Sequence, residues 1–131
     1  MGNTMEKDTL NFSMNWNGKL FTDCFTTLRR TTRYSVGQVV MVYLDGEYLY
    51  DAVVVAVQPR WLQELDEYEC HLDTGYSAAE TRGIVAKMYQ DATPKTTMYK
   101  ILLKRVKGSE HTNYNHLVRK LMPPPKQLSL L

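Results

Sequence analysis

The sequence predicts an α+β domain in which a small mixed β-barrel carries two helices packed at its side. The chain has 131 residues, which suits one domain with a single modest core. Its composition, 44% hydrophobic and 23% charged, excludes collagen-like, low-complexity and wholly disordered chains. About five segments have strand-like patterns, and two helical patterns precede the last of these strands. This order suits a small mixed barrel better than an alternating βαβ sheet.

Two segments near the start predict strands. Residues 10–14 place apolar side chains at alternate positions, which is the period of a half-buried strand. Residues 24–29 are rich in β-branched and aromatic side chains, which strands favour. Between these two strands, residues 15–18 predict a turn.

The clearest β signal is a hairpin. Residues 38–44 and 48–57 flank the pair Asp45-Gly46, which favours a tight turn. The second segment is apolar on both of its faces, so we expect it to be covered on both sides.

Two helices are predicted after this hairpin. Pro59 suits the first turn of a helix, and Trp61, Leu65 and Tyr68 then recur at helical spacing, with Glu69 among the residues expected to face solvent. A second helix is expected to begin at Ser77, because Ser77 and Glu80 have the spacing of a capping box. Its predicted buried stripe consists of Thr81, Ile84, Val85, Met88 and Tyr89.

The remaining segments set the domain boundaries. Residues 98–106 predict the last strand, and residues 116–122 predict one or two amphipathic helical turns ended by prolines. We therefore expect a flexible N-terminus over 1–9, a barrel domain over 10–107, and a basic, proline-containing tail over 108–131.

The small net charge of +2 hides an uneven distribution. Residues 35–94 carry three basic and ten acidic groups, a net −7, whereas residues 95–131 carry eight and one, a net +7. This division predicts a basic face opposite an acidic one, with a solvated surface and a basic tail as the alternative.

Several classes of protein are excluded or disfavoured. No apolar run approaches the roughly 20 residues that span a bilayer, and the polar start is not a signal peptide, so we expect a cytoplasmic protein without membrane contact. Cys24 and Cys70 are expected to be buried thiols rather than a disulfide scaffold. Neither metal-ligand spacing nor a cofactor motif is present, so no metal or cofactor is expected.

The most distinctive polar pair lies on the strand predicted over 24–29. Thr27 and Arg29 are two residues apart, so their side chains point to the same face of that strand. A hydroxyl beside a guanidinium fork is a compact recognition pair for a phosphate or a carbonyl edge. The alternative is an exposed strand with ordinary threonine and arginine side chains.

The order of these segments resembles the ASCH family of the PUA-like superfamily, over roughly residues 10–107. The resemblance rests on CFTTLR (24–29), YSVGQVVMV (34–42), VVVAV (53–57), DTGYSAAE (73–80), KMY (87–89) and YKILLKRV (99–106). It implies a β-barrel with helices at its side and a cleft lined by the Thr27 strand and by the turn before the second helix. It also implies RNA binding or, in some members, action on modified nucleosides.

The family's acetylcytidine amidohydrolases use a lysine, a threonine three residues later, an arginine and a glutamate. By position the threonine and arginine fall on Thr27 and Arg29, the lysine falls on Cys24, and the glutamate falls on or beside Thr74, next to Asp73. Because Cys24 lacks an amine and Thr74 lacks a carboxylate, we expect that the reaction is not retained in that form. Lys19 could reach the cleft from the preceding turn, but its spacing from Thr27 does not match the family pattern. The cleft is expected to persist as a binding site.

Three functions follow as hypotheses. The first is an RNA- or nucleotide-binding domain without enzymatic activity, which uses Thr27, Arg29, Arg30, Arg33, Thr74, Tyr76, Lys104 and Arg105. Tyr76 would stack on a base or, alternatively, anchor its turn against the core.

The second hypothesis is a hydrolase of a modified nucleoside, such as an acetylcytidine-like amide. Its candidate catalytic residues are Thr27, Cys24 and Asp73. The third is a protein–protein adaptor, of the kind found in phages or mobile elements, that binds a partner or self-associates through residues 111–131.

Overall fold

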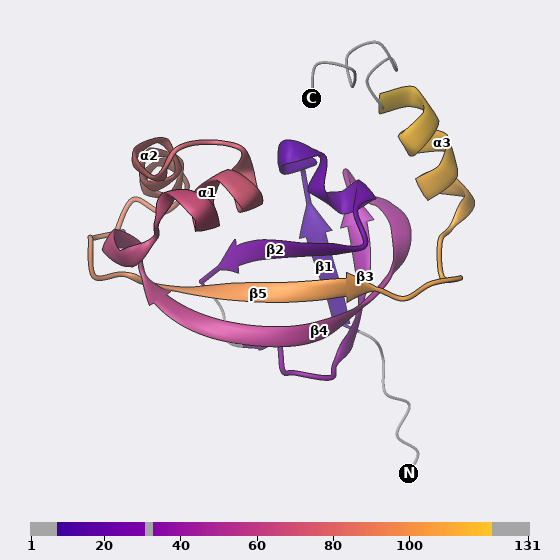
Figure 1. Cartoon of the computed structure of the whole chain (residues 1–131), viewed down its shortest axis with the longest axis horizontal. Coiled ribbons are helices and arrows are strands. Elements are labelled where there is room, and N and C mark those ends of the chain that lie inside the picture. Colours follow the sequence, from indigo (N-terminus) through magenta and orange to yellow (C-terminus); the bar gives the residue numbers. More distant parts are fainter. Residues whose placement is uncertain (1–7, 31–32, 122–131) are drawn as a thin grey trace.

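The structure is a computed structural model that describes residues 8–30 and 33–121 (Figure 1). Its strands are β1 (Asp8–Phe12), β2 (Cys24–Arg29), β3 (Val39–Leu44), β4 (Glu47–Trp61) and β5 (Thr97–Arg105). Its α-helices are α1 (Glu67–Thr74), α2 (Ala78–Met88) and α3 (Thr112–Leu121), and its short 3-10 helices are η1 (Trp16–Phe21) and η2 (Leu62–Glu64). The predicted α+β class is confirmed.

The five strands form one sheet in the order β1-β3-β4-β5-β2. β1 runs parallel to β3, and the other neighbours are antiparallel. β4 is 15 residues long and strongly curved, so its first half pairs with β3 and its second half with β5 (Figure 1). Among the described residues no strand pairing joins β1 to β2, so the sheet stays open and the predicted closed barrel is not confirmed.

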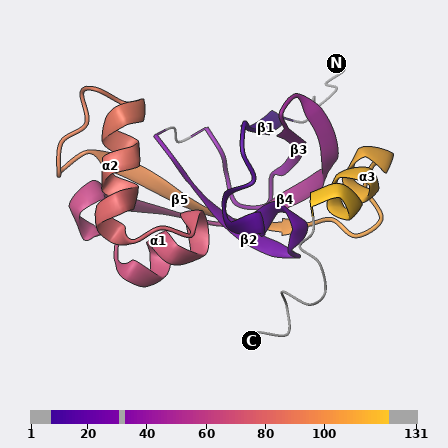
Figure 2. The same ribbon diagram turned by 90° about the horizontal axis from the view of Figure 1, so that it is seen from above.

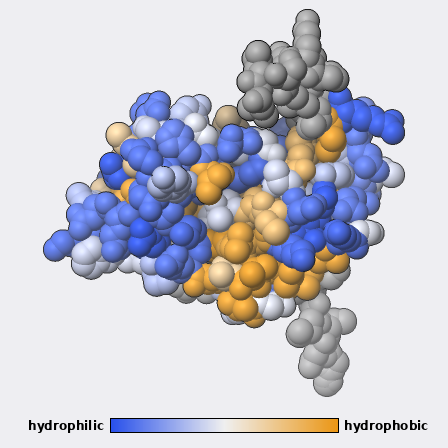
Figure 3. Space-filling model, viewed as in Figure 1, coloured by the Kyte–Doolittle hydropathy of each residue, from blue (hydrophilic) through white to orange (hydrophobic). Residues whose placement is uncertain are grey.

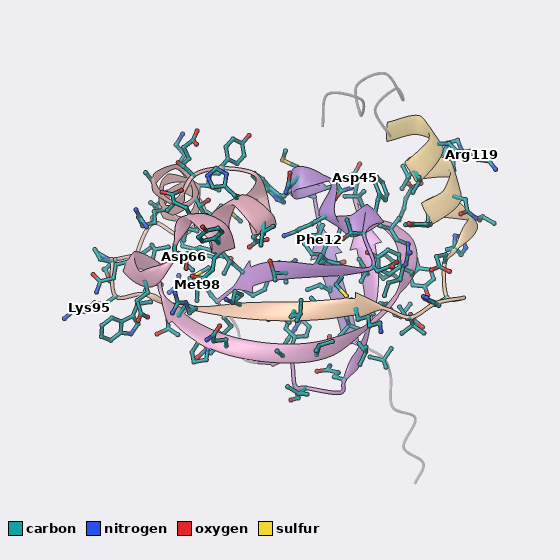
Figure 4. All side chains as sticks on the ribbon, viewed as in Figure 1. Phe12, Asp45, Asp66, Lys95, Met98 and Arg119 are labelled. Carbon is teal, nitrogen blue, oxygen red and sulfur yellow. The ribbon has the colours of Figure 1, made fainter. Side chains whose placement is uncertain are left out.

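The helices occupy opposite ends of this sheet. α1 and α2 lie together at one end and α3 lies at the other, as the two ribbon views agree (Figures 1 and 2). A large apolar core fills the concave side of the sheet, and a smaller one, which includes Cys70, Val85 and Met98, lies under the helical pair. Figure 4 shows Phe12, a member of the large core, above β2 in the middle of the molecule. The helical end is hydrophilic outside, whereas apolar side chains gather over β4 and β5 (Figure 3).

The first predicted helix is displaced. Pro59 is not in a helix: β4 continues through Pro59 to Trp61, and α1 begins only at Glu67. At Pro59, β4 pairs with β5 but no longer with β3, so one edge of the strand has no hydrogen-bonding partner. Proline, which lacks an N–H, is tolerated at such an edge. Tyr68, predicted to be buried, is 82% exposed, and Glu69, predicted to face solvent, is half-buried and forms an ion pair with Arg60.

The second helix begins as predicted. The Ser77 hydroxyl accepts a hydrogen bond from the Glu80 N–H, and the Glu80 carboxylate accepts one from the Ser77 N–H, each at 3.1 Å. Thr81 and Val85 are buried, but Met88, predicted to lie on the buried stripe, is 63% exposed. The helix ends at Met88, so this side chain lies at the rim of the packed surface.

The C-terminal helix begins at Thr112, earlier than the predicted 116–122. Tyr114 of α3 packs edge-to-face on Tyr50 and Phe21, with ring centroids 5.5 and 5.8 Å apart. The described part of the predicted tail is therefore packed on the sheet. Residues 122–131, with the predicted proline stop, lie outside the described residues, as do residues 1–7 of the predicted flexible terminus. In the described ranges 8–30 and 33–121, no helix has the length and apolarity to cross a membrane.

Candidate functional site

A cavity of about 140 Å³ lies where η1, β2 and the helical pair meet. Its polar lining includes side chains from three different elements: Lys19 of η1, Thr27 and Arg29 of β2, and Asp73 of α1. Apolar side chains complete the wall and include Phe12, Leu28, Ile84, Val85, Met88 and Tyr89. The cavity thus combines a polar cluster with an apolar wall, which is the usual composition of a small-molecule site.

The centre of the polar cluster is a buried ion pair. Lys19 Nζ donates a hydrogen bond to Asp73 Oδ1, and the two side chains are only 6% and 3% exposed. Removing two charges from water costs several kcal/mol per ion, so a buried pair is weak evidence for a stabilising role. A strongly perturbed pair in a cavity is instead a candidate for chemistry.

Burial acts on both members of this pair. It raises the pKa of Asp73, although the charge of Lys19 opposes that rise. It also lowers the pKa of Lys19, although Asp73 opposes that fall. The two shifts bring the pKa values of the amine and the carboxylate toward each other, which eases proton movement within the pair. The pair can therefore accept a proton from a neighbouring group, or return one, without leaving the cavity.

Arg29 holds the Thr27 hydroxyl in place. Arg29 Nε donates to Thr27 Oγ1 at 3.1 Å, and one terminal nitrogen, Nη2, donates to the Asn11 carbonyl at 3.0 Å. The guanidinium carbon lies 4.7 Å from the centre of the Phe12 ring. Thr27 is buried and, within the described residues, its hydroxyl donates no hydrogen bond to the protein. Its proton is therefore available to a ligand or to a base in the cavity.

Lys19 lines the cavity, although the sequence spacing had counted against it. The lysine position was assigned to Cys24, but Cys24 and Thr27 are three residues apart on a strand and so face opposite sides of it. Cys24, which was expected to be buried, is exposed at the start of β2, and it does not line the cavity. The amine comes instead from η1, eight residues before Thr27. One sequence feature is consistent with the burial of Lys19: it precedes two apolar residues, Leu20 and Phe21, in a short connection.

Two further predicted residues lie beside the cavity. Thr74 lines it, but its hydroxyl hydrogen-bonds to the Cys70 carbonyl at 2.9 Å and to the Thr81 hydroxyl at 3.0 Å. These contacts join the last turn of α1 to α2. Tyr76 is 43% exposed, and its ring packs edge-to-face on Trp16, a lining residue, at 6.0 Å.

The other predicted basic residues do not join the Thr27 cluster. Arg30 forms a two-pronged ion pair with Asp91, at 2.8 and 3.3 Å, and lies over the Tyr89 ring. Arg33 donates to the Tyr34 hydroxyl and to the Thr9 carbonyl.

Lys104 and Arg105 lie at the far end of β5. Lys104 pairs in register with Cys24, at the end of β2 away from Arg29. Arg105 contacts Asp23 and the Tyr114 hydroxyl, and its guanidinium lies over the Tyr114 ring. Arg105 therefore fastens α3 to the sheet, far along β2 from the cavity.

A second polar cluster lies on the opposite face of β2. Glu69 accepts hydrogen bonds from Arg60 at 2.7 and 3.0 Å and from Lys100 at 2.7 Å, in a pocket that Thr26 also lines. Burial raises the pKa of Glu69, but the bonds from Arg60 and Lys100 outweigh it and lower the pKa to about 2. In the part of the chain that the structure describes, no group of three His, Cys, Asp or Glu side chains is placed to hold a metal ion.

Comparison with known proteins supports the fold. No family model matches the chain, and no curated protein sequence matches it. Among solved structures, the fold is similar to that of protein EF3133 from Enterococcus faecalis V583, described with the family model DUF984. The two share 15% sequence identity at a TM-score of 0.55, over 84% of this chain and 85% of that one. At this identity the likeness is one of fold: this chain has the α+β architecture of that protein.

Proposed function

We propose that this chain is a hydrolase of a small amide, with an N-acylated nucleoside such as acetylcytidine as its substrate class. One observation carries the proposal: the buried Lys19–Asp73 pair lines the same cavity as Thr27 and Arg29. These are the residue types that the ASCH resemblance associates with amide hydrolysis, with aspartate in place of glutamate and with the lysine supplied from η1. An ASCH-like domain of the PUA-like superfamily is thus part of the proposal.

The chemistry proceeds in two stages. Thr27 Oγ1 attacks the carbonyl carbon while its proton passes to the Lys19–Asp73 pair. The C–N bond breaks, the nitrogen leaves with that proton, and the acyl group stays on Thr27 as an ester. Water then attacks the ester carbonyl, releases the carboxylic acid and restores the hydroxyl.

Arg29 supports the first stage in two ways. Its Nε–H fixes the position of Thr27 Oγ1. Its Nη1 makes no hydrogen bond to the described protein, so it remains to donate to the carbonyl oxygen, where negative charge develops. The apolar wall and the Trp16–Tyr76 pair suit a planar ring on the leaving group, since rings of this kind stack on aromatic side chains.

The test is turnover of acetylcytidine, followed by chromatographic detection of cytidine and acetate. Thr27→Val should abolish turnover because it removes the hydroxyl and keeps the shape, whereas Thr27→Ser should retain a measurable fraction. Hydrolysis that persists in Thr27→Val, or no hydrolysis of acetylcytidine and of simpler N-acetyl amides by the folded protein, would contradict the proposal.

Nucleotide or RNA binding without reaction is the second candidate. The observation that favours it is the Trp16–Tyr76 pair, whose Trp16 lines the same cavity as Arg29. Calorimetric titration separates the two candidates. Binding of cytidine or of a short RNA that weakens steeply with salt, in a protein that cleaves no amide, would support this second function. Arg29→Ala should then weaken binding, and Lys104→Ala serves as the control from outside the cavity.

A further inference from the structure

The turn that carries Lys19 has an unusual backbone. Asn17 and Gly18, the two residues before Lys19, both adopt the left-handed conformation, with φ of 58° and 66°. Asparagine tolerates this region better than most residues with a side chain, but it still costs free energy there. Glycine adopts this conformation freely, so a glycine at position 17 would avoid that free-energy cost. The contacts of the Asn17 side chain offset the cost.

Its contacts supply one. Asn17 Nδ2 donates to the carbonyl of His71 in α1 at 3.1 Å. On the other side, a Cβ built on Gly75 would come within 3.3 Å of Asn17 Oδ1 and 3.4 Å of its Cβ and Cγ. Gly75 ends α1 with φ of 82°, so both its conformation and its missing side chain make room for Asn17. The Asn17 amide is thus seated against the C-terminal turn of α1.

This seat brackets the site carboxylate. Asp73 lies between His71 and Gly75 in the sequence, and Lys19 lies two residues after Asn17. Within the described residues, side-chain hydrogen bonds from η1 to α1 are made by Asn17 to His71 and by Lys19 to Asp73. Asn15 and Thr22 bond instead within this connection, to the Leu20 N–H and the Lys19 carbonyl. The hydrogen bond from the Asn17 amide therefore joins η1 to α1 without a charge, beside the ion pair that Lys19 of η1 forms with Asp73 of α1.

We propose that Asn17 is a positioning residue, which clips η1 onto the end of α1 and so holds Lys19 Nζ against Asp73. Its effect on turnover rests on the proposed hydrolase, but its effect on the ion pair does not. Without the clip, η1 moves relative to α1, water reaches the pair, and the geometry of proton transfer is lost. A displacement of about 1 Å at a catalytic group can cost about 100-fold in rate.

The decisive variant is Asn17→Gly, which keeps the left-handed backbone and removes only the clip. Its matched control is Asn113→Ala, which removes a similar amide bond, from Asn113 Nδ2 to the Tyr48 carbonyl at 3.3 Å, far from the cavity. The Asp73 carboxyl is titrated in each protein by carbon NMR, and acetylcytidine hydrolysis is measured over the same pH range.

We expect Asn17→Gly to move the Asp73 titration toward the ordinary aspartate range. We also expect it to lower kcat by about 10- to 100-fold with little change in KM. Gly75→Ala, which crowds the same seat from α1, should move the titration in the same direction. An unchanged titration in folded Asn17→Gly, or an equal shift in Asn113→Ala, would overturn the positioning role. If wild type hydrolyses nothing, the titration alone still decides it, and only the proposed function fails.

Discussion

Two carboxylates of α1, those of Glu69 and Asp73, lie one helical turn apart but have different surroundings. Glu69 accepts hydrogen bonds from Arg60, Lys100 and the Asp66 N–H, so its charge is satisfied by several donors. Asp73 forms its ion pair with Lys19, is also stabilised by the charge of Arg29 and by the Leu28 backbone, and lies deeper. The two side chains straddle β2: Glu69 lies on the side of Thr26, and Asp73 lies in the cavity with Thr27.

These surroundings shift the pKa values of the two carboxylates in opposite directions. The bonds around Glu69 lower its pKa to about 2, so it stays ionised at all ordinary pH values and fastens α1 to the sheet. Burial raises the pKa of Asp73 although nearby positive charge opposes the rise, so the proposed reaction assigns proton exchange to Asp73 and not to Glu69.

The largest expected effect concerns turnover. Asp73→Asn removes the proton-accepting member of the pair and should lower kcat for acetylcytidine by about 1,000-fold, within the usual range for a general base. Glu69→Gln should change kcat by less than about 3-fold, because Glu69 lies outside the cavity. Assays of both purified variants check this contrast, and equal losses would remove the distinction between them.

The next effect concerns stability. Lys19→Met leaves Asp73 buried without its amine, and should reduce the free energy of unfolding by about 3 kcal/mol. The double variant Lys19→Met with Asp73→Leu should recover most of that loss, because apolar side chains of similar volume replace a buried pair at little cost. Urea denaturation measures both. A double variant as unstable as the single one would show that the pair is structural.

A third effect is the sign of the pH dependence. The pKa of Glu69 is depressed in the folded protein, so its stabilising contribution is present above pH 4.5 and is lost as the pH falls toward 2. Asp73 has a raised pKa, so its ionisation makes the unfolded state more favourable as the pH rises above 3.8. Denaturation at a series of pH values should show a flatter acid limb in Glu69→Gln, and a smaller decline above pH 3.8 in Asp73→Asn.

The smallest effect is at the start of α1. The Asp66 side chain caps the helix by accepting from the Glu69 N–H at 2.8 Å. Asp66→Ala should therefore cost about 1 kcal/mol of stability and leave kcat unchanged. Thermal unfolding together with the acetylcytidine assay checks both halves. A loss of activity at full stability would mean that the two ends of α1 are coupled.

Local signals predicted much of the fold. The strand over 24–29 matches β2 to the residue, and the Ser77 cap marks the start of α2, because both depend on neighbours in the sequence. The errors around Pro59 have a tertiary cause: whether β4 keeps β3 as a second partner at that point depends on where β3 begins, which no pattern around Pro59 records. The open sheet likewise depends on which strands occupy its edges.

The part of the candidate site that depends on local sequence was predicted, and the part that depends on tertiary contacts was not. Thr27 and Arg29 share a strand face, so their proximity follows from the period of two. Lys19 and Asp73 are 54 residues apart, and their contact depends on how η1 meets the end of α1. The resemblance assigned the lysine position to Cys24, and the alternation of the strand sends the Cys24 side chain to the face opposite Thr27. The roles of all four residues remain predictions for the assays above.

The place of β2 at the edge of the sheet has a consequence for protein synthesis. Its sheet partner is β5, and the ribosome makes β5 only after both α1 and α2. A nascent chain that ends before Thr97 already contains Lys19, Thr27 and Asp73, but it has no strand to hold Thr27 in place. The cavity therefore closes late in synthesis, and we expect an unfinished chain to be inactive in the acetylcytidine assay.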